Sequence, residues 1–344
     1  MLQRALRAAR VRVFPPPPRP LILLYHRIAD VPIDPWGNAV SPEHFGEHLQ
    51  VLRRTRHVLP LSEFVRALTT HTLPRNAVAI TFDDGYADNL LAAKPQLDNA
   101  DLPATIFLAT GYVGRSGEFW WDELTRLLLA EDDMRELKLT VAGEVMNFDF
   151  SQPGEALEIG HGWRAWLEPA RTARQRAYLS IWRAARSLTM RAREGLMAKI
   201  RAGVVAATAK DVSGRALTIN EVMILAKDPS ISIGAHTVTH PALTELDGEG
   251  RRWEIAASRA ACEELADTKV KAFAYPFGEF NSDVRAAVIE AGFDCACSAS
   301  PGIISADYDL FALPRIHVLD VNGDAFERSL FHAALAAPAA GRAR

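Results

Sequence analysis

The chain has 344 residues, of which 49% are hydrophobic, so it is long enough and apolar enough to bury one large core. Its formal net charge of −3 gives no basic field of the kind that attracts nucleic acid, and nucleic-acid partners are therefore excluded. The three cysteines, Cys262, Cys295 and Cys297, are an odd number without a spaced framework, which fits a reducing compartment.

Residues 1–20 are expected to form an N-terminal arm, with four arginines among residues 1–14 and four consecutive prolines after them. The arm has no uninterrupted apolar stretch of the roughly 7–15 residues that a secretion signal requires, which predicts a cytoplasmic protein. A short amphipathic helix that touches an anionic membrane surface is the alternative, and it would make the protein peripheral to the inner membrane leaflet. At the other end, the alanine-rich residues 331–344 are expected to be a loosely held tail.

Between these ends, short apolar runs alternate with amphipathic stretches over residues 21–330, which are expected to form one domain. The apolar runs predict parallel strands that are buried on both faces, over residues 21–26, 77–82, 104–108, 231–234, 272–275 and 295–298. The helices predicted between them cover residues 41–55, a segment from Ser62, and residues 88–99, 249–267 and 281–291. This alternation predicts an α/β fold, a distorted (β/α)7-type barrel with its site at the carboxyl ends of the strands.

Residues 115–215 interrupt the alternation and are expected to form a mainly helical insertion. A helix is predicted from Phe119, and residues 137–150 are predicted to form a hairpin that turns near Gly143. Residues 161–202 hold ten lysines and arginines against two acids, with four aromatic residues among them. Because the block far exceeds an ordinary connection, it is expected to be a lid over the site, with arginines that meet phosphate or an acidic glycan. Most of its individual tryptophans and arginines are expected to serve packing and a solvated surface instead.

Two segments place chemically active side chains directly after apolar runs. Asp83, Asp84 and a glycine follow the run at residues 77–82, and His236 and His240 follow a later run. Histidines four residues apart can share one face of a helical turn. Two imidazoles and one carboxylate make a catalytic metal site with an open position for water, which leaves the second carboxylate free to act as a base. An ordinary turn with two surface histidines is the alternative, which the joint occurrence of both segments disfavours.

These segments carry a resemblance to a known family. Residues 81–85, Thr-Phe-Asp-Asp-Gly, and residues 236–240, His-Thr-Val-Thr-His, match the first two motifs of the metal-dependent polysaccharide deacetylases without a substitution. The chain therefore resembles that family, also called the NodB-homology or carbohydrate esterase 4 family, over residues 21–110 and about 216–320. The block between these two parts is atypical of the family.

The resemblance implies a role for each motif residue. Asp83 corresponds to the family's general base, and Asp84, His236 and His240 correspond to its metal ligands. Zinc is the expected metal by ligand type, although two histidines and a carboxylate also suit cobalt, nickel or iron. An open coordination position would then serve a water molecule that Asp83 activates.

The third family motif is present with two departures. Phe277 replaces the usual tyrosine, but the family uses the backbone N–H at this position to stabilise the oxyanion, and a backbone donor does not depend on the side chain. Ala274 replaces the arginine that orients the base in the family. Arg315 is the candidate to take over that function from another strand.

The acid that protonates the leaving amine has two candidates. Most family members carry a histidine near the end of the domain, which corresponds to His317, whereas a circularly permuted branch carries it on the first strand in a Tyr-His pair. Tyr25 and His26 resemble the second arrangement, and His26 is therefore the expected acid, with His317 as the alternative. A satisfied core histidine is the alternative for either position. Residues also expected to contact the substrate are Tyr275, Arg315, His317 and Trp121.

The sequence thus predicts a metal-dependent hydrolase that removes an N-acyl group, acetyl above all, from an amino sugar in a glycan or glycan precursor. Its expected partner is this carbohydrate, which a cytoplasmic setting would favour in a lipid-linked or nucleotide-linked form. Removal of a formyl or other small acyl group from such a sugar is the alternative. A glycan-binding protein without chemistry is a further alternative, which the spare carboxylate beside the metal argues against.

Overall fold

The computed structural model describes residues 19–130, 134–141, 143–151, 162–203, 214–304 and 308–335. Nearly all of the expected N-terminal arm and the last residues of the expected tail lie outside these ranges. The last described helix, α11 (Gly323–Leu335), continues beyond residue 330, where the tail is expected to begin. Among the described helices, none combines the length and the apolar character that a membrane crossing requires.

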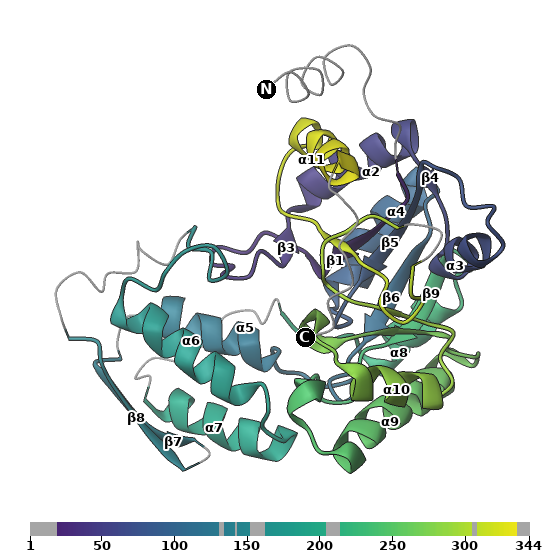
Figure 1. Cartoon of the computed structure of the whole chain (residues 1–344). Coiled ribbons are helices and arrows are strands. Elements are labelled where there is room, and N and C mark those ends of the chain that lie inside the picture. Colours follow the sequence, from purple (N-terminus) through teal and green to yellow (C-terminus); the bar gives the residue numbers. More distant parts are fainter. Residues whose placement is uncertain are drawn as a thin grey trace, which may run out of the picture.

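A curled sheet of parallel strands forms the centre of the molecule (Figure 1). Within the described residues its main path follows the order β11-β10-β9-β6-β5-β1-β12, with every neighbouring pair parallel. These strands are β1 (Leu21–Tyr25), β5 (Ala77–Phe82), β6 (Ala104–Leu108), β9 (Ile231–Ala235), β10 (Ala272–Ala274), β11 (Cys295–Cys297) and β12 (Ile316–His317). A further short strand, β4 (His57–Val58), pairs with the start of β5. Strands β1, β5 and β6 are buried at every position because their sequences are almost entirely apolar.

The two edges of the sheet are brought together by the segment before β12. The N–H of Ala296 in β11 donates to the carbonyl of Leu310 at 2.8 Å, and the N–H of Leu313 donates back to Ala296 at 3.0 Å. A few residues later β12 pairs with β1, where His317 lies opposite Leu24. The sheet is therefore curled into an incomplete barrel, and the predicted (β/α)-barrel class is confirmed.

Helices cover the outside of the barrel. Besides α11 they are α2 (Pro42–Thr55), α3 (Leu61–Thr69), α4 (Lys94–Ala100), α8 (Ile219–Ala226), α9 (Gly248–Ala266) and α10 (Ser282–Glu290). The five predicted helices are present, whereas α8 and α11 were not predicted from the sequence. Helix α4 is extended at its start by a π-helical turn, Asn89–Ala93. Helix α2 packs on α4 and α11, whereas α9 packs on α8 and α10 at the other side of the sheet (Figure 1). A small parallel pair, β2 (Arg27–Ile28) and β3 (Ala39–Val40), lies near the carboxyl end of β1.

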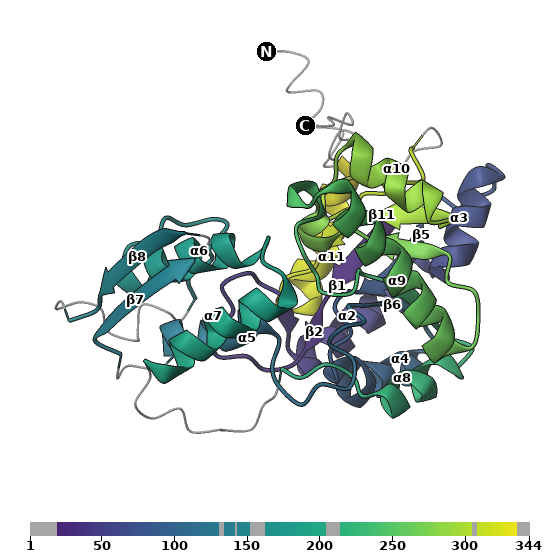
Figure 2. The same ribbon diagram turned by 90° about the horizontal axis from the view of Figure 1, so that it is seen from below.

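The insertion stands to one side of the barrel, with its hairpin at the end farthest from the sheet (Figure 1, Figure 2). It contains α5 (Trp120–Thr125), a π-helical turn (Arg126–Ala130), the hairpin strands β7 (Glu136–Val141) and β8 (Glu144–Asp149), α6 (Ala173–Ala185) and α7 (Met190–Ala202). The predicted hairpin is thus present, with antiparallel pairing. The chain enters and leaves side by side, because Glu118 forms an antiparallel bridge with Arg215. Trp163 and Tyr178 are buried in a core that the insertion shares with Tyr86 of the barrel.

Candidate active site

The two adjacent carboxylates lie where β5 ends. Asp83 and Asp84 follow the six buried residues of β5 and are themselves only 3% exposed. The chain turns sharply here, because both Asp84 and Gly85 have positive φ angles of 72° and 79°. A Cβ at Gly85 would lie 2.6 Å from the side chain of Leu108, so glycine fits both the backbone conformation and the space. The turn directs two buried acids to the carboxyl end of the sheet.

The two histidines lie on a tight turn after β9. Their spacing predicts a helical turn, but the observed turn is not helical. Thr237 and His240 both have left-handed backbone angles, with φ of 67° and 54°. The buried side chain of Glu254, on α9, accepts the N–H groups of Val238 and Thr239, each at 2.8 Å. The two left-handed residues fold the turn back on itself, so His236 and His240 meet with ring centroids 4.7 Å apart.

Three side chains converge as a candidate metal site. Oδ1 of Asp84 lies 3.5 Å from Nε2 of both His236 and His240, and the ligand atoms of all three lie within 4.8 Å of one another. Nδ1 of His236 is 2.7 Å from the carbonyl of Ala274, a contact that leaves Nε2 for the convergence point. Asp84 Oδ1 is buried and has no hydrogen-bond partner. Two imidazole nitrogens and an unpartnered carboxylate oxygen fit a divalent cation.

The electrostatics of this trio agree with that fit. Burial raises the pKa of Asp84 well above its usual range, and the negative charge of Asp83 acts in the same direction. Burial also lowers the pKa of His236 and, more strongly, that of His240, so both imidazoles are neutral. Neutral imidazoles are the form that binds metal, and a bound cation would remove the unfavourable burial of the Asp84 charge.

Asp83 is held by a buried arginine from the segment before β12. Arg315 is 0% exposed, and its two terminal nitrogens bond the two carboxylate oxygens of Asp83 at 2.7 and 2.6 Å. Nε of Arg315 also donates to the carbonyl of Ser298 at 2.8 Å. Burial alone would raise the pKa of Asp83, but the charge of Arg315 and its hydrogen bonds outweigh burial and hold the pKa below its usual value. Asp83 is thus an ionised, oriented carboxylate beside the trio.

The sequence profile of one protein family matches the parts of the chain that carry the two motifs. The profile is described as "Polysaccharide deacetylase", and the match covers residues 70–134 and 206–296. These two segments are similar to the polysaccharide deacetylase family, and the match confirms the resemblance that the motifs predict. A curated relative, YxkH of Bacillus subtilis (strain 168), is 29% identical over 97 residues, which span 28% of this chain and only 35% of that protein.

Solved structures of similar fold include deacetylases. The Streptococcus pyogenes deacetylase PplD, solved with acetate, has a TM-score of 0.57 at 19% identity, over 91% of this chain and 99% of that one. IcaB from Ammonifex degensii has a TM-score of 0.54 at 16% identity, over 92% and 97% of the two chains. At such identities the likeness establishes the shared fold. The family profile, by contrast, leaves residues 135–205 unmatched, which are most of the expected insertion.

Outside the profile match, the two candidate acids lie next to each other. The rings of His26 and His317 are 5.5 Å apart between centroids, because β1 and β12 are neighbouring strands. Nδ1 of His26 and Nε2 of His317 are both buried without a hydrogen-bond partner. Burial lowers the pKa of His26 to about 3, although the charge of Asp83 acts in the opposite direction. Burial also lowers the pKa of His317.

The third family motif forms another wall of the site. Phe277 has a positive φ of 58°, and its ring lies 4.6 Å from that of His240. Tyr275 is buried, and its hydroxyl donates to the carbonyl of Phe311 at 2.9 Å, so this hydroxyl is occupied within the protein. Arg315 is expected to contact substrate, but its complete burial and its bonds to Asp83 place it behind the base instead.

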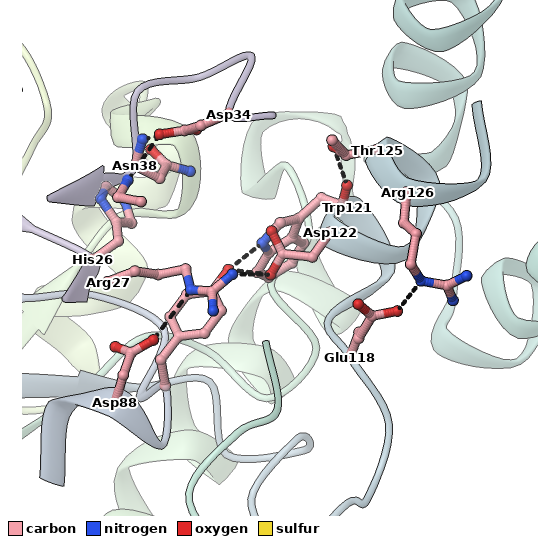
Figure 3. Close-up of polar contacts among 12 residues, drawn as sticks. His26, Arg27, Asp34, Asn38, Asp88, Glu118, Trp121, Asp122, Thr125 and Arg126 are labelled. Atoms are coloured by element: carbon pink, nitrogen blue, oxygen red, sulfur yellow. Dashed lines mark hydrogen bonds and ion pairs between the residues drawn. The ribbon is translucent and has the colours of Figure 1, made fainter. Parts of the chain in front are cut away.

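A buried polar cluster joins the insertion to the barrel beside this site (Figure 3). Arg27 lies between two acids, with Nε 3.1 Å from Asp88 and Nη1 3.9 Å from Asp122 of α5. The hydroxyl of Tyr86 donates to Asp122 at 2.7 Å and accepts from Trp121 Nε1 at 2.6 Å. The Trp121 ring packs against His240 of the candidate metal site, with ring centroids 4.8 Å apart. Trp121, expected to contact substrate, is thus only 6% exposed and packs against the site wall.

The site opens into a cleft of about 770 Å³ between the barrel and the insertion. Its lining includes every expected site residue except Arg315. These are His26, Asp83, Asp84, Trp121, His236, His240, Tyr275, Phe277 and His317. The insertion contributes to the same lining, as a lid would; its residues there are Trp121, Ala165, Trp166, Trp182, Arg183 and Arg186.

Sequence reasoning missed two buried residues that hold the histidine turn. One is Glu254, and a signal for it exists, because it falls on the same face of α9 as the buried Ile255, Ser258 and Cys262. The other is Arg193 of α7, whose Nη1 donates to the carbonyl of Thr239 at 2.8 Å. Arg193 is one of ten basic residues in its stretch, and nothing local distinguishes it from the rest.

Proposed function

We propose that this protein is a metal-dependent deacetylase that hydrolyses the N-acetyl group of an amino sugar in a glycan or a glycan precursor. The observation that carries the proposal is that two neighbouring carboxylates have different surroundings, one suited to bind a metal and the other to act as a base. Asp84 faces His236 and His240 without a partner, whereas Asp83, next to it, is ionised and fixed by Arg315. The match to the polysaccharide deacetylase profile and the deacetylases among the similar folds support the same reaction.

Asp84, His236 and His240 would hold the metal, and zinc suits this ligand set, with cobalt, nickel or iron as substitutes. A bound divalent cation acts as a Lewis acid toward the attacking water and the amide carbonyl. Asp83 accepts a proton from that water as the water oxygen bonds to the acyl carbon. Phe277 lines the cleft, and its N–H would stabilise the negative charge that develops on the carbonyl oxygen.

His26 completes the reaction by giving a proton to the amine nitrogen as the carbon–nitrogen bond breaks, which releases acetate and a free amino sugar. Its low pKa makes the resting imidazole neutral, so it must gain a proton before it can act as the acid. The charge of Asp83 favours this protonated form of His26, and the two groups form a functional pair for that reason.

The direct test measures acetate release from a panel of N-acetylated sugars and glycans, free and lipid-linked, with protein loaded with zinc. We expect release that stops on chelation and resumes when the metal is restored. An Asp84→Ala variant should lose both bound metal, measured by elemental analysis, and activity. Full activity with full metal content in that variant would reject the assignment of the ligand.

The same panel separates the alternatives. Release of formate or another acid, with no acetate, would identify a different acyl group. A protein that binds glycans, takes up no metal and releases no acid would be a binding protein. The three cysteines are free and buried, which supports a reducing, cytoplasmic setting and a precursor as the substrate.

A further inference from the structure

The proposed reaction uses the floor of the cleft but leaves its rim without a role. The insertion supplies that rim, with Ala165 and Trp166 from the segment before α6 and Trp182, Arg183 and Arg186 from α6 and its end. None of these side chains belongs to the candidate metal site or to the groups that hold it. A site of this volume has room for more than the one sugar whose acyl group is removed.

Only two of the ten basic residues at 161–202 reach this cleft, namely Arg183 and Arg186. Others in the stretch are engaged in the fold. Arg174 and Arg193 are buried and bond main-chain carbonyls, and Arg201 pairs with glutamates of the insertion. Of the basic residues that were expected to contact an anion, only Arg183 and Arg186 are therefore placed to contact an anionic ligand in the cleft.

Arg186 is fixed in place, whereas Arg183 retains its charge for a ligand. The guanidinium of Arg186 lies 4.3 Å from the centre of the Phe277 ring and 5.1 Å from that of Trp182, and it pairs with Glu279. Arg183 is exposed, lines the cleft and forms no ion pair within the described ranges. Arg186 neutralises the negative charge of Glu279. The positive charge of Arg183 therefore gives this rim a local positive potential.

The rim also has an accessible aromatic surface. Trp166 is 47% exposed, whereas Trp163, three residues earlier, is 4% exposed and packs against Tyr178. Trp182 is half-buried and packs against Trp36 of the barrel, with ring centroids 4.3 Å apart, so it supports the rim. Of these three tryptophans, Trp166 is the most exposed, and it lines the cleft. An exposed indole and an unpaired guanidinium on the lining of one cleft suit a sugar ring that carries an anionic group.

We propose that Trp166 and Arg183 form a rim subsite for a second sugar that bears an anionic group, adjacent to the sugar that loses its acyl group. The inference rests on the proposed function. The indole of Trp166 packs against the sugar ring, and the guanidinium of Arg183 bonds the oxyanion. A phosphate ester and the carboxylate of a uronic acid share this chemistry, and the experiment separates them.

The experiment compares three disaccharides as substrates of the zinc-loaded full chain: N,N′-diacetylchitobiose, its 1-phosphate, and glucuronic acid linked to N-acetylglucosamine. We expect at least one anionic compound to have a higher kcat/KM than the neutral one, through a lower KM, with an advantage that shrinks as salt rises. Arg183→Ala should reduce the anionic-to-neutral ratio of kcat/KM on the order of tenfold, and Arg183→Lys should restore part of it. The matched control, Arg191→Ala, removes an exposed arginine of α7 that does not line the cleft, and it should keep the wild-type ratio.

Equal kcat/KM values for all three compounds, with no effect of Arg183→Ala on their ratio, would overturn the subsite while leaving the proposed function intact. A preference for the phosphate or for the uronate would support the subsite and identify the source of the charge. Calorimetric binding of the same compounds to chelated protein provides a readout without catalysis. Binding that depends on Arg183, in a protein that deacetylates nothing, would reject the proposed function and keep the subsite.

Discussion

At the scale of single residues, the orientation of the base depends on an arginine that is distant in sequence. The family's usual arginine is replaced by Ala274, and Arg315 approaches Asp83 instead from the segment before β12. The pair is buried and bidentate, so its geometry determines both the direction and the charge of the Asp83 carboxylate. A lysine cannot reproduce two parallel hydrogen bonds.

We therefore expect Arg315→Lys to lower kcat/KM on N-acetyl sugars on the order of 10-fold to 100-fold. Loss of the two parallel hydrogen bonds from the guanidinium should also raise the pKa of Asp83. Because the base acts in its ionised form and is lost as pH falls through its pKa, the acid limb of the pH–rate profile should move to higher pH. Arg285→Lys is the control, since Arg285 makes the same bidentate contact with Asp309 at the exposed surface. An unmoved acid limb in Arg315→Lys would contradict the assignment of Asp83.

His26 and His317 are the two candidates for the acid that protonates the leaving amine. His26→Ala should lower kcat by about 10²–10⁴-fold while the affinity for zinc stays close to that of the wild type. His317→Ala should have a modest effect, although its ring lies only 5.5 Å away. Steady-state kinetics on the substrate identified in the panel, with zinc titrations of each variant, measure both quantities. A larger loss of kcat in His317→Ala than in His26→Ala would instead identify His317 as the acid.

Residues within one short motif could be predicted, and residues that act across the fold could not. Asp84, His236 and His240 could be predicted from the sequence because each follows an apolar run that ends at the same edge of the sheet. Arg315 lies 232 residues from Asp83, so only the candidate could be named, and its location behind the base needed the fold. Arg193 gave no local signal at all.

At the scale of secondary-structure elements, the turn after β9 depends on α9. One carboxylate, that of Glu254, accepts two main-chain N–H groups of the turn that carries both histidines. The carboxylate is buried, so the N–H groups have no water to replace it. Helix α9 thereby sets the distance between His236 and His240.

Glu254→Gln should accordingly weaken zinc binding by about 10-fold to 100-fold, the usual effect of losing a group that supports metal ligands. The same carboxylate oxygen accepts both N–H groups, and an uncharged amide oxygen is a weaker acceptor for them. The amide nitrogen, a donor, would also replace the second oxygen, which accepts from the Thr239 hydroxyl. Zinc affinity measured by competition with a chelator checks the expectation. Glu249→Gln, an exposed position in the first turn of the same helix, is the matched control and should leave the affinity unchanged. Equal affinities in the two variants would remove Glu254 from this function.

The long buried strands were predictable because uninterrupted apolar runs mark them, as in β5 and β6. The two-residue strands β4 and β12 were not, since two residues show no periodicity. The histidine turn was predicted as a helical turn because the spacing of four residues fits one. Its real shape follows from left-handed residues and from Glu254, and neither is visible in the spacing.

At the scale of the whole molecule, the barrel and the insertion share a core. Tyr86, Ala109 and Tyr112 of the barrel are buried in the same cluster as α5, α6 and α7. The buried Arg27 and the partly buried Asp122 add an ion pair across the same boundary. Replacing residues 115–215 by a linker would therefore uncover this cluster and leave Arg27 without its partner from α5.

We expect the barrel and the insertion to unfold in one transition. All tryptophans except Trp253 lie in the insertion or pack against it, so tryptophan fluorescence follows that part, whereas far-UV circular dichroism follows the helices of both. The two signals should give coincident midpoints in urea. Two resolved transitions, with fluorescence changing first, would show that the insertion is an independent unit.

The backbone around the cleft has one further consequence. Among the described residues, seven non-glycine positions have left-handed φ angles, and three of them, His71, Asp101 and Asp267, simply end helices. The others surround the catalytic floor: Asp84, Thr237, His240 and Phe277. Each such residue costs about 1–3 kcal/mol, and the rest of the fold holds it there. The active geometry is therefore preorganised during folding, and a more stable variant obtained by relaxing these turns would sacrifice activity for stability.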